Sequence, residues 1–285
     1  MPCPYRADRN VRPTRKNMDN ATDNRNYDPF EEFTLGSGSH AILCIHGLGC
    51  APLLYYEVGR ELADAGYTVR AILLPGHGTT LKDFAETPWT AWYDKVEREY
   101  AALAGKYDRV SVIGFSIGSM LATKLASERK VERLALLGPP YYIIRRWFPL
   151  RVALKTLGRF VSKVPTLRMS RRFRTAEGWV RHSTPMVEYF PLSTIATVDA
   201  LVRNVRLLVK EVSCPTVIIV SRCDISTDPR GGKVMMRRLK IKEKELLKLS
   251  WSHHQMLQGC QRHRVLRKLI EFFKAQRTGR EKNQW

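Results

Sequence analysis

A serine between two glycines is the residue of this sequence best suited to nucleophilic chemistry. Gly114-Phe-Ser116-Ile-Gly118 follows the β-branched run 110–113 and precedes the helix-favouring run 119–126. A strand before the serine and a helix after it are typical of a nucleophile elbow, a sharp turn that exposes the hydroxyl. The helix start would also direct backbone N–H groups toward a developing oxyanion. We therefore interpret Ser116 as a candidate nucleophile, although a plain glycine-rich turn that carries a serine would show the same letters.

Carboxylates that follow predicted strands are the candidates for orienting a catalytic base. A serine hydroxyl needs a base within hydrogen-bonding distance, and the base in turn needs an orienting carboxylate. Functional groups of open parallel sheets gather at the carboxyl ends of the strands. Asp224 follows the apolar run 216–220 through Ser221-Arg-Cys, whereas Asp228 lies four residues further on and Asp199 is more remote. We therefore predict that Asp224 is the acid.

Two adjacent histidines are the candidates for the base. His253 and His254 follow the predicted strand 245–249 and precede the last predicted helix, 262–274. We prefer His254 as the base and interpret His253 as a polar loop residue. The resulting chain order of serine, aspartate and histidine is the order found in α/β-hydrolase folds.

A second glycine-rich turn could supply a further anion-stabilising group. His46-Gly47-Leu48-Gly49 follows the continuous apolar run 40–46, and such a turn can direct a backbone N–H at a reacting carbonyl oxygen. By that geometry we predict that the oxyanion donors are the N–H groups of Leu48 and Ile117. The alternative interpretation of residues 46–49 is a plain tight turn. His77, in the separate turn Pro-Gly-His-Gly, is expected to be structural.

Alternating strand and helix patterns predict the elements that position these residues. The regular alternation predicts an α/β fold with a mostly parallel, doubly wound sheet and right-handed crossovers. It breaks at Tyr141 and resumes near residue 201. After an opening strand and turn at 30–38, we expect strands at 40–46, 67–74, 109–113, 131–137, 216–220 and 245–249. Helices are expected at 53–65, 90–103, 117–128, 201–210, 231–239 and 262–274.

Composition narrows the class of protein further. Of the 285 residues, 44% are hydrophobic, which is ample for a core, yet no apolar run is long enough to span a bilayer. Residues 1–29 are predicted to form a disordered arm, with Met18 as an alternative start to Met1, and they lack the apolar segment of a secretory signal. The six cysteines contain no Cys-x-x-Cys pair, so we expect reduced thiols, a cytoplasmic location and no metal site.

With these residues in place, the chain resembles the α/β-hydrolase superfamily, and within it the small bacterial carboxylesterases and monoacylglycerol lipases. The resemblance rests on His46-Gly-Leu-Gly, Leu74-Pro-Gly-His-Gly, the Ser116 pentapeptide, Ser221-Arg-Cys-Asp and Ser252-His-His. It implies a hydrolase core at 30–140 and 201–285, with a helical cap at 141–200 over an acyl pocket. It also implies carboxylic ester cleavage by Ser116, His254 and Asp224 through an acyl-enzyme, with no cofactor. Ser119 departs from the family, in which glycine is common at that position.

The net charge of +21 is concentrated in two stretches. Residues 145–182 contain eleven Lys/Arg and one acid, and residues 229–280 contain fifteen Lys/Arg and three acids. Within the first stretch, apolar residues recur at three- and four-residue steps and basic residues at four, which predicts a basic amphipathic helix over 145–165.

This basic helix has several interpretations. It could be a cap helix with its apolar stripe on the acyl pocket and a solvated basic face, or it could dock on an anionic membrane. A third possible partner of the basic helix is an anionic substrate, such as an acyl thioester that carries phosphates. For the whole protein, the alternative to an enzyme is a hydrolase-fold protein that binds membranes or polyanions without turnover. Charge alone would also suit nucleic acid, but no nucleic-acid-binding motif supports that reading.

Overall fold

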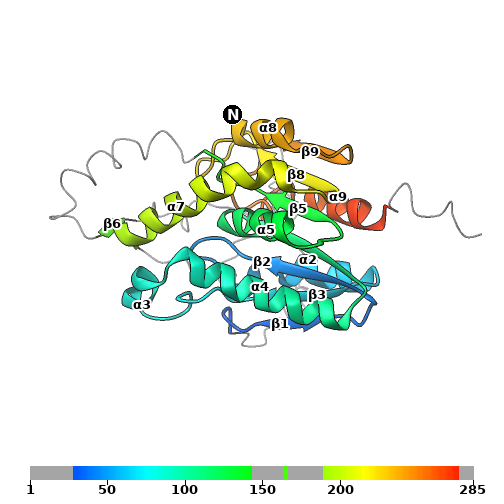
Figure 1. Cartoon of the computed structure of the whole chain (residues 1–285), viewed down its shortest axis with the longest axis horizontal. Coiled ribbons are helices and arrows are strands. Elements are labelled where there is room, and N and C mark those ends of the chain that lie inside the picture. Colours follow the sequence, from blue (N-terminus) through cyan, green and yellow to red (C-terminus); the bar gives the residue numbers. More distant parts are fainter. Residues whose placement is uncertain (1–27, 143–162, 166–188, 276–285) are drawn as a thin grey trace, which may run out of the picture.

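A seven-stranded sheet forms the centre of the computed structural model, which describes residues 28–142, 163–165 and 189–275. Its strand order is β1-β3-β2-β4-β5-β8-β9 (Figure 1). β1 is antiparallel to β3, and all the other neighbours are parallel. The strands are β1 (Phe33–Leu35), β2 (His40–Ile45), β3 (Thr68–Ile72), β4 (Arg109–Phe115), β5 (Leu134–Leu137), β8 (Thr216–Ser221) and β9 (Lys244–Leu249).

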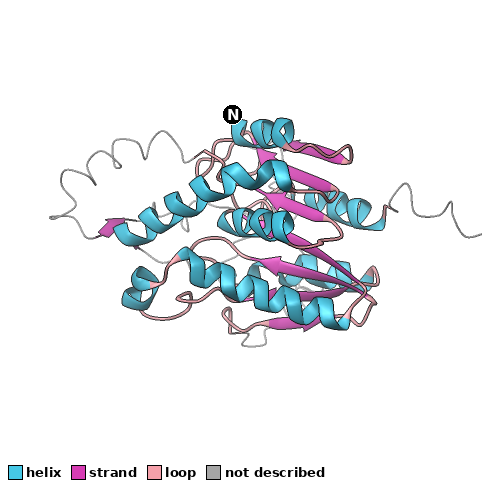
Figure 2. Ribbon diagram, in the orientation of Figure 1, coloured by secondary structure: helices cyan, strands magenta, loops and turns pink. Residues whose placement is uncertain are grey.

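Helices cover both faces of this sheet (Figure 2). One face packs against α4 (Trp89–Lys106), α5 (Ile117–Glu128), α7 (Leu192–Leu208) and α8 (Arg230–Arg238). The other face packs against α2 (Tyr56–Asp64) and α9 (Arg262–Lys274). The short helix α3 (Leu81–Glu86) lies beside α7, and short 3-10 helices occupy Pro52–Tyr55 and Val209–Glu211. This is the doubly wound α/β arrangement that the alternating pattern predicted.

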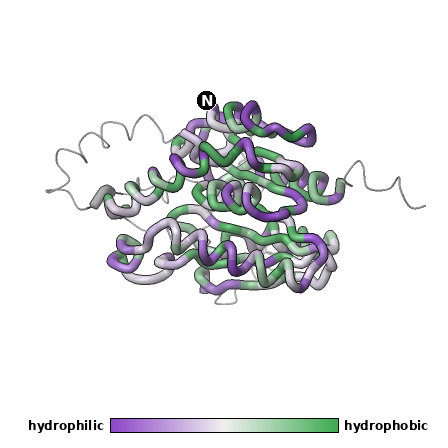
Figure 3. The backbone as a smooth tube through the Cα atoms, viewed as in Figure 1, coloured by the Kyte–Doolittle hydropathy of each residue, from purple (hydrophilic) through white to green (hydrophobic). Residues whose placement is uncertain are grey.

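The apolar strands are buried on both faces, as expected of a covered parallel sheet. All six residues of β2 are buried; Leu43 and Ile45 point into one core cluster, and Ile42 and Cys44 point into the other. In the hydropathy view the sheet strands are largely hydrophobic (Figure 3). Cys44 is a buried free thiol, in line with the reduced cysteines expected from the sequence.

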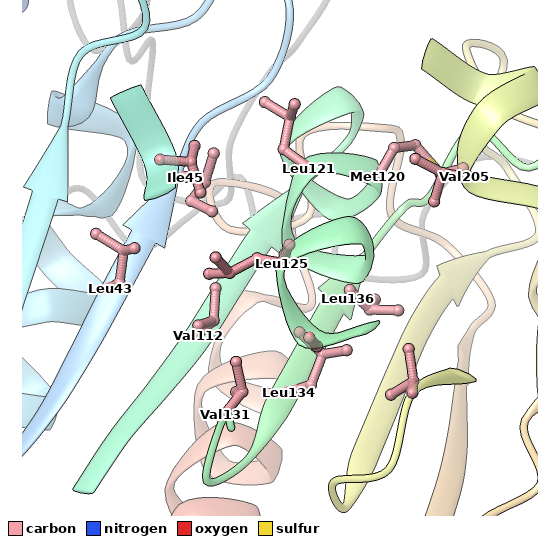
Figure 4. Close-up of a cluster of buried hydrophobic side chains, with 14 of the residues drawn as sticks. Leu43, Ile45, Val112, Met120, Leu121, Leu125, Val131, Leu134, Leu136 and Val205 are labelled. Atoms are coloured by element: carbon pink, nitrogen blue, oxygen red, sulfur yellow. The ribbon is translucent and has the colours of Figure 1, made fainter. Parts of the chain in front are cut away.

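Helix α5 lies at the centre of the larger core cluster. Its residues Met120, Leu121 and Leu125 are fully buried against the sheet and α7 (Figure 4). Truncating a buried leucine of this kind to alanine costs about 2–5 kcal/mol, so the helix is firmly anchored. Because Ser116 immediately precedes α5, this packing also fixes the position of the candidate nucleophile.

Most predicted elements occur in the structure, and two of them, α5 and α9, have the predicted bounds. Two differences are informative. Helix α3, which the sequence analysis did not predict, begins with a capping box formed by Thr80 and Asp83. Helix α7 begins at Leu192, nine residues before the predicted start at 201, and therefore crosses the boundary predicted between cap and core.

The predicted basic helix over 145–165 is wrong at its end. Residues Lys163–Pro165 form strand β6, which pairs antiparallel with β7 (Tyr189–Pro191). Proline disfavours helical backbone at the preceding residue, which explains why Val164 is extended. The remainder of that predicted helix, and the predicted N-terminal arm at 1–27, lie outside the described residues. Among the helices that are described, none has the length and apolar character required to cross a bilayer.

Candidate active site

Ser116 occupies a strained backbone position between β4 and α5. Its φ of 54° and ψ of −121° make it the one non-glycine residue with positive φ in the described part of the chain. Such conformations cost about 1–3 kcal/mol and cluster at functional sites. The Ser116 N–H donates to the carbonyl of Leu137 on the neighbouring strand over 2.8 Å, which helps to hold the turn. The structure therefore contains the sharp turn that the pentapeptide predicted.

The two glycines around Ser116 are required by close backbone contacts. A Cβ atom at Gly118 would lie 2.2 Å from the carbonyl oxygen of Ile45, and one at Gly114 would lie 2.3 Å from that of Gly118. Both distances are far below van der Waals contact. Helix α5 can thus approach β2 and β4 closely only because these positions lack side chains.

Ser119, where the family resemblance led us to expect a glycine, is accommodated within the elbow. Its buried hydroxyl lies 2.7 Å from the carbonyl oxygen of Gly114 and 3.0 Å from that of Leu137. The hydroxyl hydrogen is therefore satisfied, and burying this polar group carries no unpaired-donor penalty. The departure from the family pattern leaves the elbow intact.

Asp224 and His254 form the central polar contact of the site. His254 Nδ1 lies 2.7 Å from Asp224 Oδ2, and both residues are buried. The second oxygen of Asp224 accepts the N–H groups of Ser226 and Thr227, at 2.7 and 2.9 Å, while the Thr227 hydroxyl donates to Oδ2 over 2.7 Å. The carboxylate is thus fixed by its own loop and can orient the imidazole.

These contacts determine the ionisation of Asp224. Burial on its own raises the pKa of the carboxyl group, but the His254 imidazole and the hydrogen bonds from Thr227 outweigh burial. The net pKa of Asp224 lies below its ordinary value, so the group is a carboxylate at neutral pH. A carboxylate accepts the Nδ1 hydrogen of His254, which leaves Nε2 as the basic nitrogen.

The His254 ring lies beside the residues that precede and support Ser116. Its centroid is 4.8 Å from that of Phe115, the residue directly before the serine. On another side, a Cβ atom at Gly138 would lie 3.2 Å from His254 Cε1. Gly138 follows β5, the neighbour of β4, and donates its N–H to Ile219. The loops after β4, β5, β8 and β9 therefore meet around this imidazole.

The residues considered as alternatives have other partners. His253 is exposed, and its Nδ1 lies 3.3 Å from the carbonyl oxygen of Cys223. Asp228 forms an ion pair with Arg230, and Asp199 forms one with Arg203 on α7. Among these acids and histidines, Asp224 and His254 are the pair that the structure brings into hydrogen-bonding contact.

The turn at residues 46–49 lies directly against the serine. A Cβ atom at Gly47 would lie 3.0 Å from Ser116 Cβ, so the backbone of this turn borders Ser116. Leu48, whose N–H was predicted as one oxyanion donor, follows Gly47 and is half-buried. Ile117, the other predicted donor, is the first residue of α5, where an N–H has no acceptor within its own helix.

His46 fixes this turn, a role that the sequence analysis did not assign. Its Nε2 accepts the backbone N–H of Leu74 over 3.0 Å, so Nδ1 carries the hydrogen and donates to the Gly47 carbonyl over 2.8 Å. Burial and the nearby His77 lower the pKa of His46, which is therefore neutral. The pairing depends on contact between two chain segments, and no local sequence signal reports it.

His77 is buried behind the same turn. Its ring packs edge-on against His46 and Phe84, with centroid distances of 4.8 and 4.9 Å. Burial lowers the pKa of His77 to about 4, and within the described residues its Nε2 has no hydrogen-bond partner. The side chain contributes packing against the turn at residues 46–49.

The family of this chain follows from comparison with known proteins. Residues 42–263 match the model of the alpha/beta hydrolase family, which is most of the sequence. Together with the sheet topology and the strained serine turn, this match shows that the chain belongs to the alpha/beta hydrolase family.

Relatives and solved structures agree with this assignment. The chain is 22% identical to a carboxylesterase of Bacillus subtilis (strain 168) over 245 residues, covering 84% of this chain and 94% of that protein. It is also 22% identical to a thermostable monoacylglycerol lipase of Bacillus sp. (strain H-257), and this match covers 85% of this chain and 94% of that protein. Among solved structures, one reported for the metagenome-derived lipolytic enzymes LipS and LipT superposes with a TM-score of 0.76 at 22% sequence identity, covering 86% of this chain and 98% of that one. A soluble variant of the monoglyceride lipase of Saccharomyces cerevisiae superposes with a TM-score of 0.73 at 16% sequence identity, and the match covers 87% of this chain and 93% of that one.

Proposed function

We propose that this protein is a serine hydrolase that cleaves carboxylic esters, of the carboxylesterase or monoacylglycerol-lipase type. The observation that carries the proposal is the hydrogen bond between Asp224 and His254 beside the strained turn at Ser116. The similarity to a carboxylesterase and a monoacylglycerol lipase supports ester substrates. The proposed catalytic groups are Ser116, His254 and Asp224, with oxyanion donors from Leu48 and Ile117.

In the proposed mechanism, His254 Nε2 takes the hydroxyl proton of Ser116 as Oγ bonds to the carbonyl carbon of the ester. The carbonyl π electrons move onto oxygen, and the N–H groups of Leu48 and Ile117 stabilise that oxyanion; one such donor contributes about 3 kcal/mol. Collapse of the tetrahedral intermediate breaks the bond to the alcohol, which receives the proton from His254. Asp224 stabilises the imidazolium and remains a carboxylate.

Water completes the cycle by the same steps. His254 removes a proton from water as its oxygen attacks the acyl carbon, and the proton then returns to Ser116 Oγ as the acid product leaves. The chemistry needs no cofactor, because the nucleophile, base and oxyanion donors all come from the chain. The strained turn holds Ser116 in one conformation and so reduces the entropy lost on reaching the transition state.

An esterase assay separates this proposal from a binding protein without turnover. Release of nitrophenol from nitrophenyl esters of increasing acyl length is measured for the wild type, for Ser116→Ala and for Ser127→Ala. Ser127 lies on α5, where its hydroxyl donates a hydrogen bond to the Lys124 carbonyl, and it serves as the matched control. We expect Ser116→Ala to abolish release and Ser127→Ala to retain it. Release that does not depend on Ser116 at any acyl length would overturn the proposal, whereas a preference for acyl thioesters would revise the substrate.

The eleven Lys/Arg against one acid in residues 145–182 support a second, separate proposal: contact with an anionic membrane surface from a cytoplasmic location. Each Lys or Arg near such a surface contributes about 1 kcal/mol, and the attraction weakens as salt screens it. Sedimentation with anionic and neutral vesicles at low and high salt tests it. Salt-sensitive binding to anionic vesicles alone is expected, and equal binding to both vesicle types would count against it.

A further inference from the structure

The side chain of Gln255 connects the loop of His254 with the turn that follows β2. Gln255 directly follows His254, and its Nε2 donates to Cys50 Sγ over 3.7 Å, although the two residues are 205 positions apart in the chain. Cys50 is 4% exposed and belongs to the apolar cluster on one face of the sheet. The contact therefore joins two loops of the candidate active site, one with the proposed base and one with the proposed oxyanion donor Leu48.

Cys50 is the last residue of the turn that contains Leu48. Its backbone N–H donates to the Gly47 carbonyl over 3.1 Å, and this hydrogen bond closes a β-turn. The His46 ring donates to the same carbonyl and so holds the start of the turn. Gln255 contacts its last residue. The Leu48 N–H lies in the chain between these two points of attachment.

The amide of Gln255 is a costly group to place at this position. Its Oε1 is buried and has no hydrogen-bond partner within the described residues, and an unpaired buried acceptor lowers stability. The contact of Nε2 with sulfur, a weak acceptor, offsets little of that cost. Burial raises the pKa of Cys50 to about 11, so the acceptor is a neutral thiol. An apolar side chain of the same length would therefore be at least as stable here, and the amide needs an explanation other than stability.

We propose that Gln255 is a positioning residue, which holds the turn of Leu48 in register with His254 for ester cleavage; this inference rests on the proposed function. The oxyanion forms as His254 accepts the proton, so the oxyanion donor and the base must be aligned at the same moment. A displacement of about 1 Å at a reacting group can lower a rate about 100-fold. Gln255 acts on the turn through Cys50, and not on the ester itself.

Steady-state hydrolysis of a nitrophenyl ester by Gln255→Met tests the proposal. Methionine is unbranched and of similar length, so it removes the Nε2 contact and the unpaired Oε1 while still filling the space. We expect kcat and kcat/KM to fall together by about tenfold, because the contact matters only when the oxyanion forms. The pH profile should keep its shape, since the bond between Asp224 and His254 is retained. Urea unfolding of the same samples should show stability equal to or above that of the wild type.

Two further variants separate positioning from a purely structural role. Cys50→Ala removes the same contact from the other side, so its kcat should also fall, and the double variant should lose no more than the larger single loss. Gln261→Met is the matched control, because Gln261 lies in the same loop and its Oε1 accepts the Trp251 N–H over 2.9 Å. This control should lose stability and keep kcat within a few-fold.

The outcomes distinguish this inference from the proposed function. Unchanged turnover by Gln255→Met, additive losses in the double variant or a shifted pH profile would overturn the role of Gln255 alone. A wild type without turnover that depends on Ser116 would overturn the proposed function and this inference with it.

Discussion

His254 Nδ1 lies 2.7 Å from Asp224 Oδ2, and this hydrogen bond joins the loop after β8 to the loop after β9. Asp224 cannot rotate away without breaking its bonds to Ser226 and Thr227. The ring orientation is consequently built into the unliganded fold. Pre-organisation of this kind is what acid–base catalysis requires, because the base need not be reoriented when the substrate arrives.

Asp224→Asn should remove most esterase activity while preserving the fold. The amide cannot stabilise an imidazolium, and it favours the wrong tautomer of His254, an effect that lowers kcat about 10⁴-fold in serine proteases. Steady-state hydrolysis of a nitrophenyl ester measures the loss. Asp228→Asn is the matched control, since Asp228 is paired with Arg230, and it should retain activity within a few-fold. Comparable losses in the two variants would contradict the assignment of Asp224.

The stability of the protein should fall on acidification because of buried neutral histidines. The pKa of His77 is lowered from 6.5 to about 4, so between these values the unfolded chain binds a proton that the folded chain does not. Acid therefore favours unfolding across that interval, by roughly 3 kcal/mol for this group at most.

Urea unfolding of wild type and His77→Gln at pH 7 and pH 4.5 measures this contribution. The variant should lose less stability between the two pH values than the wild type does. An unchanged pH dependence in His77→Gln would show that His77 is protonated in the folded protein.

Gly118→Ala should destabilise the protein by roughly 3 kcal/mol or more and displace Ser116. The added methyl would meet the Ile45 carbonyl at 2.2 Å, and close-packed backbone cannot yield without moving α5 away from β2. Gly105→Ala is the control, because no atom lies within 4 Å of a Cβ there and its position on α4 is helical.

For Gly105→Ala we expect a gain of about 0.5–1 kcal/mol, since alanine loses less backbone entropy in a helix. Thermal unfolding of both variants provides the comparison. A neutral Gly118→Ala would mean that the elbow is not as tightly packed as the structure indicates.

Local sequence patterns predicted those elements well whose own residues give a strong, uniform signal. The wholly apolar β2 and the Gly–Ser–Gly turn before α5 are strong signals, and α5 was predicted with its observed bounds. The signal for α3 was also present, as the Thr80–Asp83 capping box, but the helix has only six residues. Pro191 directly precedes α7 as a helix-start signal, but the predicted cap extended to residue 200 and the predicted helix therefore began too late.

Tertiary contacts could not be predicted in the same way. The bond from the Leu74 N–H to His46 joins segments 28 residues apart, and nothing in either segment identifies the other. The predicted acid and base, by contrast, followed from one rule, that functional groups lie where parallel strands end.

Covalent labelling is a direct test of whether Ser116 is the nucleophile. The protein is treated with a fluorophosphonate, digested and analysed by mass spectrometry, with Ser116→Ala and Ser127→Ala in parallel. We expect one adduct on the peptide that contains Ser116, present in the wild type and in Ser127→Ala and absent from Ser116→Ala. A wild-type protein that remains unlabelled, or a label carried by another residue with ester turnover intact in Ser116→Ala, would contradict it.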